Sequence, residues 1–348
     1  MSYAFPTDQN ASRLGQINKA GDTRELFLKL YAGEVLRAFN KINIMRPLHK
    51  VKSLQGGKSH RFPLLGGAKA KYHTPGKMIE ADAIGHTERE VKIDDLLISS
   101  QFIANIDEAM NHYDVRSEYA KQSGQALSDL FDRNVLRVAC QASFITTKAE
   151  ATTAKLNPLD DEVFTKNIDL SYSGDELDGK ALVDAIFAAK TEFEEKSVSG
   201  EPVIILRPAQ YYALFEAEGV DRMQWLNSDV GGTGSFAEAK IPMIAGMRVY
   251  KSVQLPSTDE SAGLGGDDPE SNFDAAKYRG DYSKVVGLVM TQEAVATAQL
   301  MNLNHESEYQ MSRQGTLMLS KMAVGHDILR PACAITILKS DTARPTKA

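Results

Sequence analysis

The stretch from Asp114 to Ser143 constrains the fold most, because no proline interrupts it and its apolar residues recur at helical spacing. Asp114 is a suitable N-cap, and Gly124 weakens such a helix by only about 1 kcal/mol. One helix over this stretch is about 45 Å long, more than double the average globular helix. We therefore expect a rigid helix along which other parts of the chain are arranged. Its apolar stripe consists of Tyr119, Leu127, Leu130, Phe131, Val135 and Val138.

The composition is that of an ordinary globular protein. Of 348 residues, 43% are hydrophobic and 25% are charged, and the formal net charge is -6. This charge argues against a protein that coats nucleic acid, but not against one that encloses it. Cys140 and Cys333 lie among apolar neighbours, which predicts buried thiols in a reducing compartment. Because no signal peptide and no membrane-spanning apolar run is present, we expect a cytosolic product without membrane contact.

A basic segment precedes the long helix. Between Arg46 and Ile79 every charged side chain is Lys or Arg, and glycines and prolines are frequent. The flanks, His49–Leu54 and Glu88–Leu97, partly alternate between apolar and polar residues, as strands do, which predicts a long two-stranded ribbon. Because an isolated ribbon is marginally stable, we expect it to lie on an acidic face of another copy of the chain. The alternative is a nucleic-acid-binding protein that acts through residues 46–79.

The remaining segments predict an α/β domain and a returning sheet. Asp22 and Glu25 have capping-box spacing and open a helix through about Asn40. Residues 145–178 are polar, irregular and acidic, and the Gly- and Asp-rich loop 256–281 is expected to be exposed and mobile. Helices are predicted at 180–196 and 208–219, strands at 202–206, 246–255, 285–290, 295–303 and 333–338, and either a strand or a helix at 309–326.

Motifs for catalysis or metal binding are absent from the sequence. Gly57-Lys58-Ser59 suggests a phosphate loop, but Lys52 stands where that motif requires its first glycine. A His112–Asp114 dyad is conceivable, although a role in helix capping is favoured. Carboxylates cluster at residues 160–162 and 175–178, but without the alternation of a calcium loop, so solvated acidic loops are favoured. We expect no enzyme activity, no cofactor and no metal.

Four sequence words carry a family resemblance. They are AGEVLRAF at residues 32–39, GKSHRFP at 57–63, DEAMNHYDVRSEY at 107–119 and GHDILRP at 325–331. Closely similar words occur in the major capsid proteins of short-tailed phages like the T-odd coliphages, the autographivirus podophages. The chain resembles this family over nearly its whole length, and the word at 107–119 is the most specific.

The resemblance implies an α+β fold of the Hong-Kong-97 capsid type. It implies a subunit that assembles as hexamers and pentamers into an icosahedral shell around double-stranded DNA, in the virion and, before that, in the host cytoplasm. Its partners would be other copies of itself, a scaffolding protein, a portal protein and packaged DNA bound without sequence specificity. The expected parts are an N-terminal arm (1–21), a helix (22–45), an extended loop (46–95), a peripheral domain (96–179 and 285–340), an axial domain (180–284) and a tail (341–348).

The candidate contact residues between subunits come from two places. The basic ribbon is expected to contact an acidic face of a neighbouring copy. The resemblance implies structural or inter-subunit bonds for the polar head of the long helix, residues 107–119. The candidates are Lys58, Arg61, Lys69, Lys71, Asp114 and Arg116.

Overall fold

A computed structural model describes residues 34–39, 43–68, 70–79, 83–104, 115–159, 162–216, 241, 243–262 and 275–343. The chain divides into two compact units. Unit 1 contains Met1–Asn43, Leu96–Leu130 and Met301–Ala323, and unit 2 contains Ile44–Asp95, Phe131–Leu300 and Val324–Ala348. The arm predicted at 1–21 lies outside the described residues, as do most of the helix predicted from Asp22 and the His112–Asp114 pair.

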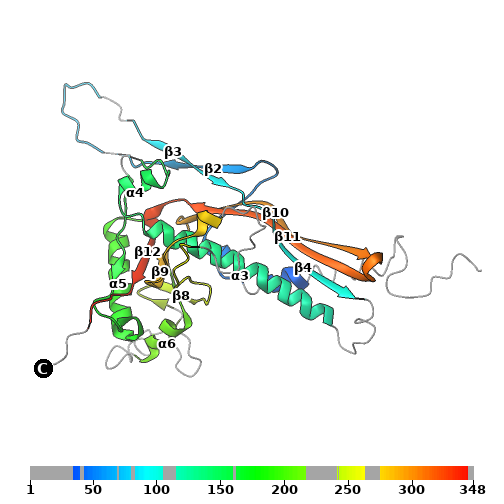
Figure 1. Ribbon diagram of the computed structural model, residues 1–348. Helices are drawn as coiled ribbons and strands as arrows, with labels where there is room; N and C mark the ends of the chain where they lie inside the picture. The colour runs from blue at the N-terminus through cyan, green and yellow to red at the C-terminus, as the bar shows by residue number, and fades with distance from the viewer. Residues whose placement is uncertain are drawn as a thin grey trace, which may run out of the picture. The chain divides into compact units, whose positions relative to one another are not determined.

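The predicted long helix is confirmed as α3, Val115–Ser143, a single helix (Figure 1). Leu127, Phe131, Val135 and Val138 are buried as the stripe predicted. Leu130, by contrast, is exposed, so the prediction was wrong for that residue.

Unit 1 packs three neighbouring strands of one sheet against the first half of α3. Strand β4, Leu97–Ala104, runs antiparallel to β11, Gly315–Ile328. The side of the sheet that faces α3 includes Ser99, whose hydroxyl donates to Ser123 Oγ at 3.3 Å. The core of this unit consists of Val35, Ile103, Ala120 and Met318, with Tyr119 and Leu303 packed against it.

Gly124 allows a close approach between α3 and the helical residues 34–39. A Cβ at this position would lie 2.7 Å from the Val35 carbonyl oxygen and 2.8 Å from the Ala38 Cβ. Such distances are too short for any side chain, so only glycine lets the two helices approach this closely. Gly124 is therefore a packing requirement and not merely a weak helix former.

Unit 2 is built on a six-stranded mixed sheet. Helices α5, Gly179–Glu195, and α6, Pro208–Glu216, pack against this sheet through one apolar core. Both helices and the fully buried strand β6 confirm the α/β pattern of the sequence. The strand order is β5 (Ile168–Asp169), β12 (Ala334–Leu338), β9 (Val285–Met290), β6 (Val203–Leu206), β8 (Met247–Lys251) and β7 (Met243–Ile244).

The predicted ribbon is present, but with a different pairing of its flanks. Strands β2, Ser59–Leu65, and β3, His86–Lys92, pair antiparallel with each other. Strand β1, Lys50–Ser53, does not join them, because it pairs in parallel with β10, Val295–Gln310. Together β1, β10, β11 and β4 form a four-stranded sheet in that order.

One further segment differs from the sequence prediction, and the structure decides the segment that the sequence left open between strand and helix. The irregular segment after α3 contains a short helix, α4, Lys148–Thr153, opened by a capping box between Thr147 and Glu150. The ambiguous segment 309–326 is mostly strand, because β10 continues to Gln310 and β11 begins at Gly315. A single 3-10 turn, Met311–Arg313, joins the two strands, with Gln314 at a positive φ of 47°.

Candidate assembly surface

The ribbon of β2 and β3 has one buried and one exposed face. Phe62 and Leu64 on β2 and Val91 on β3 pack against Ala296, Ala298 and Leu329 of the same chain. On the opposite face Arg61 pairs with Glu88 at 3.3 Å, and the Ser59 hydroxyl donates to Glu90 at 2.6 Å. The ribbon is therefore stabilised by its own subunit on one face. On the other face β3, the strand that returns toward α3, supplies carboxylates, which the basic segment 46–79 lacks.

Arg89 fixes the return strand from the buried side. Its side chain is buried, and its Nη2 donates to both carboxylate oxygens of Glu162, at 2.9 and 3.0 Å. Its Nε donates to the Leu329 carbonyl oxygen at 3.3 Å. Glu162 also accepts from the Leu159 backbone N–H at 3.0 Å, so this carboxylate from the predicted acidic cluster has a structural role.

Asp132 on α3 holds the chain at the entrance to the ribbon. Its carboxylate accepts from the backbone N–H of Ile44 at 2.9 Å and of Met45 at 3.2 Å. The sequence pattern placed Asp132 outside the apolar stripe, yet it is buried because these two N–H groups satisfy it. Helix α3 thus anchors the segment from which the ribbon starts.

A chain of hydrogen bonds runs from Met45 through His49 and Thr297 to His326. His49 Nδ1 lies 2.6 Å from the Met45 carbonyl oxygen, which can only accept, so Nδ1 carries the proton. His49 Nε2 then accepts from the Thr297 hydroxyl at 2.7 Å, and Thr297 accepts from His326 Nδ1 at 2.8 Å. Because its Nε2 accepts a hydrogen bond, the His49 imidazole is neutral. Burial lowers the pKa of His49 to about 4 and lowers the pKa of His326 well below its ordinary value.

A second, partly buried cluster joins Asp94, just after β3, to η4, Ala275–Tyr278. Lys277 Nζ lies 3.1 Å from Asp94, and the Tyr278 hydroxyl donates to the same carboxylate. Burial raises the pKa of Asp94 despite the neighbouring ammonium group, and it raises the pKa of Tyr278. The Tyr278 ring packs edge-on toward His326, so the two clusters are adjacent.

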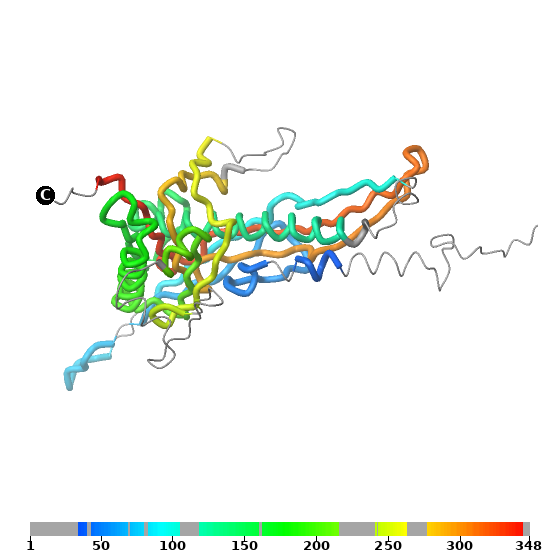
Figure 2. The backbone as a smooth tube through the Cα atoms, turned by 90° about the horizontal axis from the view of Figure 1, so that it is seen from below, coloured from blue at the N-terminus to red at the C-terminus, as the bar shows by residue number. Residues whose placement is uncertain are grey.

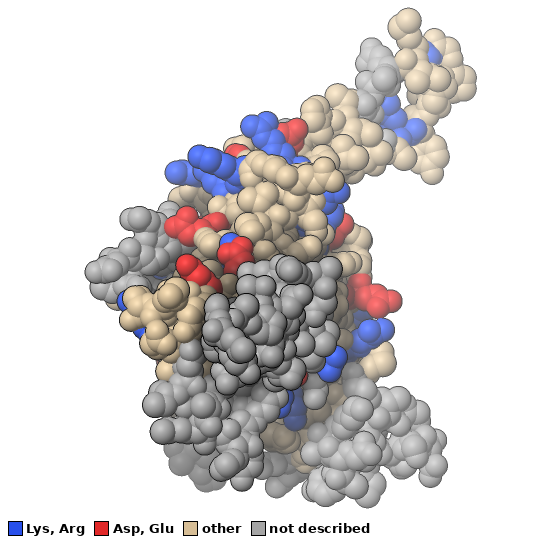
Figure 3. All heavy atoms as spheres, turned by 90° about the vertical axis from the view of Figure 1, so that its right-hand side faces the viewer, with Lys and Arg blue, Asp and Glu red and all other residues tan. Residues whose placement is uncertain are grey.

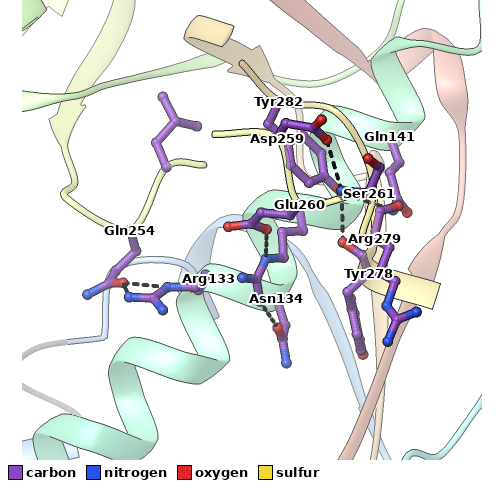
Figure 4. A network of polar contacts seen from close by, with 12 residues as sticks. Arg133, Asn134, Gln141, Gln254, Asp259, Glu260, Ser261, Tyr278, Arg279 and Tyr282 are labelled. Atoms are coloured by element: carbon purple, nitrogen blue, oxygen red, sulfur yellow. Dashed lines mark hydrogen bonds and ion pairs between the residues drawn. The ribbon is translucent and has the colours of Figure 1, made fainter. Parts of the chain in front are cut away.

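A row of polar side chains on α3 holds the segment that the sequence predicted to be mobile (Figure 4). Arg133 donates twice to Gln254, Arg137 pairs with Glu260 at 2.7 Å, and Gln141 donates to the Tyr282 hydroxyl at 2.9 Å. Residues 258–260 and 280–282 also hydrogen-bond to one another. Hydrogen bonds therefore hold the described ends of loop 256–281, although Thr258, Asp259, Ser261 and Ala262 are exposed as predicted; residues 263–274 lie outside the described chain.

Beyond Leu65 the ribbon ends in an extended tip, defined here as residues 66–79. Thr74 and Lys77 close a turn through a backbone hydrogen bond of 3.2 Å, with Pro75 and Gly76 between them and Gly76 at φ +88°. Tyr72, Met78 and Ile79 are 105%, 90% and 77% exposed. Both backbone views show the tip projecting away from the rest of unit 2 (Figure 2). The tip therefore presents apolar side chains that its own subunit does not bury.

The predicted contact residues have different positions in the structure. Lys58, Arg61 and Lys71 are exposed, the first two at the ribbon and the third on the tip. Lys69, Asp114 and the side chain of Arg116 lie outside the described part of the chain. The sequence did not single out Arg89, Asp132 or the two buried histidines. An arginine on the apolar side of an alternating strand was the one available signal, and it applies to Arg89.

The charge pattern does not favour the nucleic-acid alternative. Glu88 and Glu90 interleave with the basic residues of the ribbon, and Arg61 is paired. On the face shown in Figure 3, basic and acidic side chains lie among one another. A surface that binds the phosphate backbone usually groups its cations along one stripe.

The described residues contain no group of three or more His, Cys, Asp or Glu side chains that could hold a metal ion. Cys140 and Cys333 are buried free thiols, as predicted, and burial raises the pKa of Cys333 to about 11. Asp175 and Asp178, from the second acidic cluster, accept backbone N–H groups at a turn and at the start of α5. None of the described helices has the length and apolar character to cross a membrane.

Comparisons with known proteins give one consistent result. Residues 61–338 match the model of the Gp10A-like family, described as major capsid protein. The major capsid protein of Escherichia phage T7 is 30% identical over 328 residues, which cover 90% of this chain and 92% of that protein. The match to the capsid structure of cyanophage P-SCSP1u covers 98% of this chain and 100% of the cyanophage chain. The two are 34% identical, with a TM-score of 0.69. The mature capsid of bacteriophage PhiM1 is 17% identical, and the match covers 86% of this chain and 87% of that one. Its TM-score is 0.66, so the two share the fold.

Proposed function

The chain belongs to the Gp10A-like family of major capsid proteins, and from this premise we propose how its copies hold one another in the shell. The predicted α+β fold of the Hong-Kong-97 capsid type is confirmed, as is the role of structural subunit of an icosahedral phage capsid. The proposal concerns the finer arrangement: hexamers and pentamers in which the ribbon of one subunit crosses onto helix α3 and the peripheral domain of the next.

The observation that carries this proposal is the contrast within the ribbon. Its paired strands are held by Arg89, Phe62 and the segment that Asp132 anchors, so they form a rigid base. Its tip leaves Tyr72, Met78 and Ile79 in solvent. A rigid base with an exposed apolar end suits a contact between subunits, because little further conformational entropy is lost when the contact forms.

The charges of the ribbon add a second, weaker contribution. Lys58 and Lys71 are exposed on a chain whose net charge is -6, so neighbouring copies offer many carboxylates as partners. Single exposed ion pairs contribute about 0–1 kcal/mol each, but a shell repeats every contact many times.

Charge reversal tests the proposed role of the ribbon. Lys58→Glu combined with Lys71→Glu should leave the subunit folded and reduce the yield of closed shells, seen by electron microscopy after co-expression with a scaffolding protein. Lys180→Glu, at the exposed first turn of α5, is the matched control and should assemble normally. Normal shell yield from the double variant would remove the ribbon charges from the proposal.

The remaining partners follow from the same premise. We propose that a scaffolding protein and a portal protein assist assembly in the host cytoplasm, and that the enclosed double-stranded DNA is held without sequence specificity. An acidic subunit with interleaved surface charges would bind that DNA weakly, which a filter-binding titration against salt measures as a shallow slope. A steep slope would instead favour the nucleic-acid alternative.

A further inference from the structure

The short 3-10 helix η4 contacts both the end of the ribbon and the segment that α3 holds. It contains only the four residues Ala275–Tyr278. A 3-10 helix of this length is not stable by itself, because it has few hydrogen bonds and their geometry is poor. Side chains of other elements must therefore hold η4 in place, and the structure shows two groups of such contacts.

The first group of contacts comes from the end of the ribbon. The carboxylate of Asp94, just after β3, lies 3.1 Å from Lys277 Nζ and accepts from the Tyr278 hydroxyl. The backbone N–H of Asp94 donates to the Val324 carbonyl oxygen at 3.1 Å, so the carboxylate is itself fixed in position. Tyr278 is fully buried, and water therefore cannot replace this carboxylate as the acceptor of its hydroxyl.

The second group of contacts comes from α3 and is seen in Figure 4. Gln141 Nε2 donates to the Arg279 carbonyl oxygen at 3.0 Å and to the Tyr282 hydroxyl at 2.9 Å. The Tyr282 hydroxyl in turn donates to the Tyr278 carbonyl oxygen at 2.9 Å. The last residue of η4 is thus bonded through its hydroxyl to the ribbon and through its carbonyl oxygen, by way of Tyr282, to α3.

The residues after η4 also hold the start of loop 256–281. The N–H of Glu260 donates to the Gly280 carbonyl oxygen at 3.0 Å, and the N–H of Tyr282 donates to the Thr258 carbonyl oxygen at 3.2 Å. We call residues 258–260 and 280–282 the loop base. Because Tyr282 belongs both to the loop base and to the contacts of η4, a shift of η4 disturbs the loop base as well.

We propose that η4 couples the ribbon to the loop base within one subunit. The two states are η4 ordered, as in the structure, and η4 locally open, and the contacts on each side favour the ordered state. Loss of either group of contacts therefore weakens the other. By the same linkage, a partner that fixes the ribbon stabilises the loop base of the same subunit. This inference concerns a single chain and does not depend on where the ribbon binds.

Hydrogen exchange of the full-length subunit, read by mass spectrometry, tests the coupling from the α3 side. Gln141→Ala removes contacts of α3 only. The distant reporters are the amides of Ile93 and Asp94 at the end of the ribbon, which donate to backbone carbonyl oxygens at 2.9 and 3.1 Å. Gln125→Ala is the matched control, because Gln125 is an exposed residue of the same helix.

The reverse direction uses a substitution at the ribbon. Asp94→Ala removes the acceptor of Lys277 and Tyr278, and the distant reporters are the amides of Glu260 and Tyr282 in the loop base. The exposed neighbour gives the matched control, Asp95→Ala. Tyr278→Phe removes a single hydroxyl and keeps the ring, so it serves as the milder variant if Asp94→Ala does not fold.

We expect each test variant to speed exchange at its distant reporters about tenfold, because the loss of one or two buried hydrogen bonds raises the open population by roughly that factor. The two controls should leave the reporters unchanged. Faster exchange confined to the substituted side would show that the two groups of contacts are independent, and it would overturn the inference. Equally faster exchange in the buried strand β6, Val203–Leu206, would indicate general destabilisation and would also overturn it.

Discussion

The paired strands of the ribbon and its tip belong to one continuous excursion, yet they are stabilised in different ways. Along β2, Phe62 and Leu64 alternate with polar or exposed residues, so one face of the pair is buried against the chain's own strand β10. Beyond Leu65 this alternation ends, and the apolar side chains of Tyr72, Met78 and Ile79 stay in solvent. The subunit thus buries one face of the paired strands itself, whereas the apolar side chains of the described tip stay exposed, which fits the proposed contact with a neighbouring subunit.

Substitution of Gly325 should have the largest effect on the base of the ribbon. A Cβ at this position would overlap the Lys92 carbonyl oxygen and crowd the Ile93 Cα, which are backbone atoms that cannot move aside alone. We expect Gly325→Ala to lower the free energy of unfolding by about 4 kcal/mol, measured by urea denaturation.

Gly56 provides the control for this substitution, because a Cβ there meets nothing within 4 Å. Gly56→Ala should change stability by less than about 0.5 kcal/mol. Equal effects of the two variants would contradict the close approach between β11 and the end of the ribbon.

Removal of Arg89 should have the next largest effect. Arg89→Met leaves the largely buried Glu162 carboxylate without its partner, which should cost about 3 kcal/mol in thermal or urea unfolding. The double variant Arg89→Met with Glu162→Met should recover part of this loss, because no buried charge then remains. A double variant as unstable as the single one would show that packing of the long side chain, and not its charge, holds β3.

The buried histidines should make the base sensitive to acid. His49 has an ordinary pKa of 6.5 and a folded pKa of about 4, so between these values the unfolded chain binds more protons than the folded chain. Stability should therefore fall as pH decreases through this window, with a contribution from His49 of up to about 1.4 kcal/mol per pH unit. Urea midpoints between pH 4.5 and 7 measure the slope, and His49→Gln should reduce it. The idea is wrong if both proteins show the same slope.

Substitutions at the tip should have the smallest effect on the isolated subunit. Tyr72→Ser combined with Met78→Ser removes side chains that touch little of their own chain, so the free energy of unfolding should change by less than about 0.5 kcal/mol. The yield of closed shells should nevertheless fall. A variant that loses stability but still assembles would reverse the proposed difference between the base and the tip.

Much of the fold was predictable, because periodicity is a local property. The spacing of apolar residues gave α3, α5, β6 and β9 close to their observed bounds. The choice of strand partners was not predictable in this way, and β1 pairs with β10 and not with the return strand. A short strand alternates in the same manner whichever partner it has.

The candidate surface was predictable only in part. The sequence indicated a basic ribbon and named Lys58, Arg61 and Lys71, which are exposed in the structure. It did not indicate which side chains hold the base, because the partners of Arg89 and Asp132 lie 73 and more than 80 residues away along the chain. Such contacts form only after distant segments meet, so no local pattern reports them.

By itself the sequence determined the long helix, the basic segment that precedes it and the family of the chain, since these depend on residue order alone. The tertiary structure decided that Gly124 and Gly325 are required for close approach, that His49 is neutral, and that the ends of loop 256–281 are anchored. The physical reason is that burial and hydrogen bonding belong to a place in space. A residue acquires that environment from neighbours that the chain brings together only when it folds.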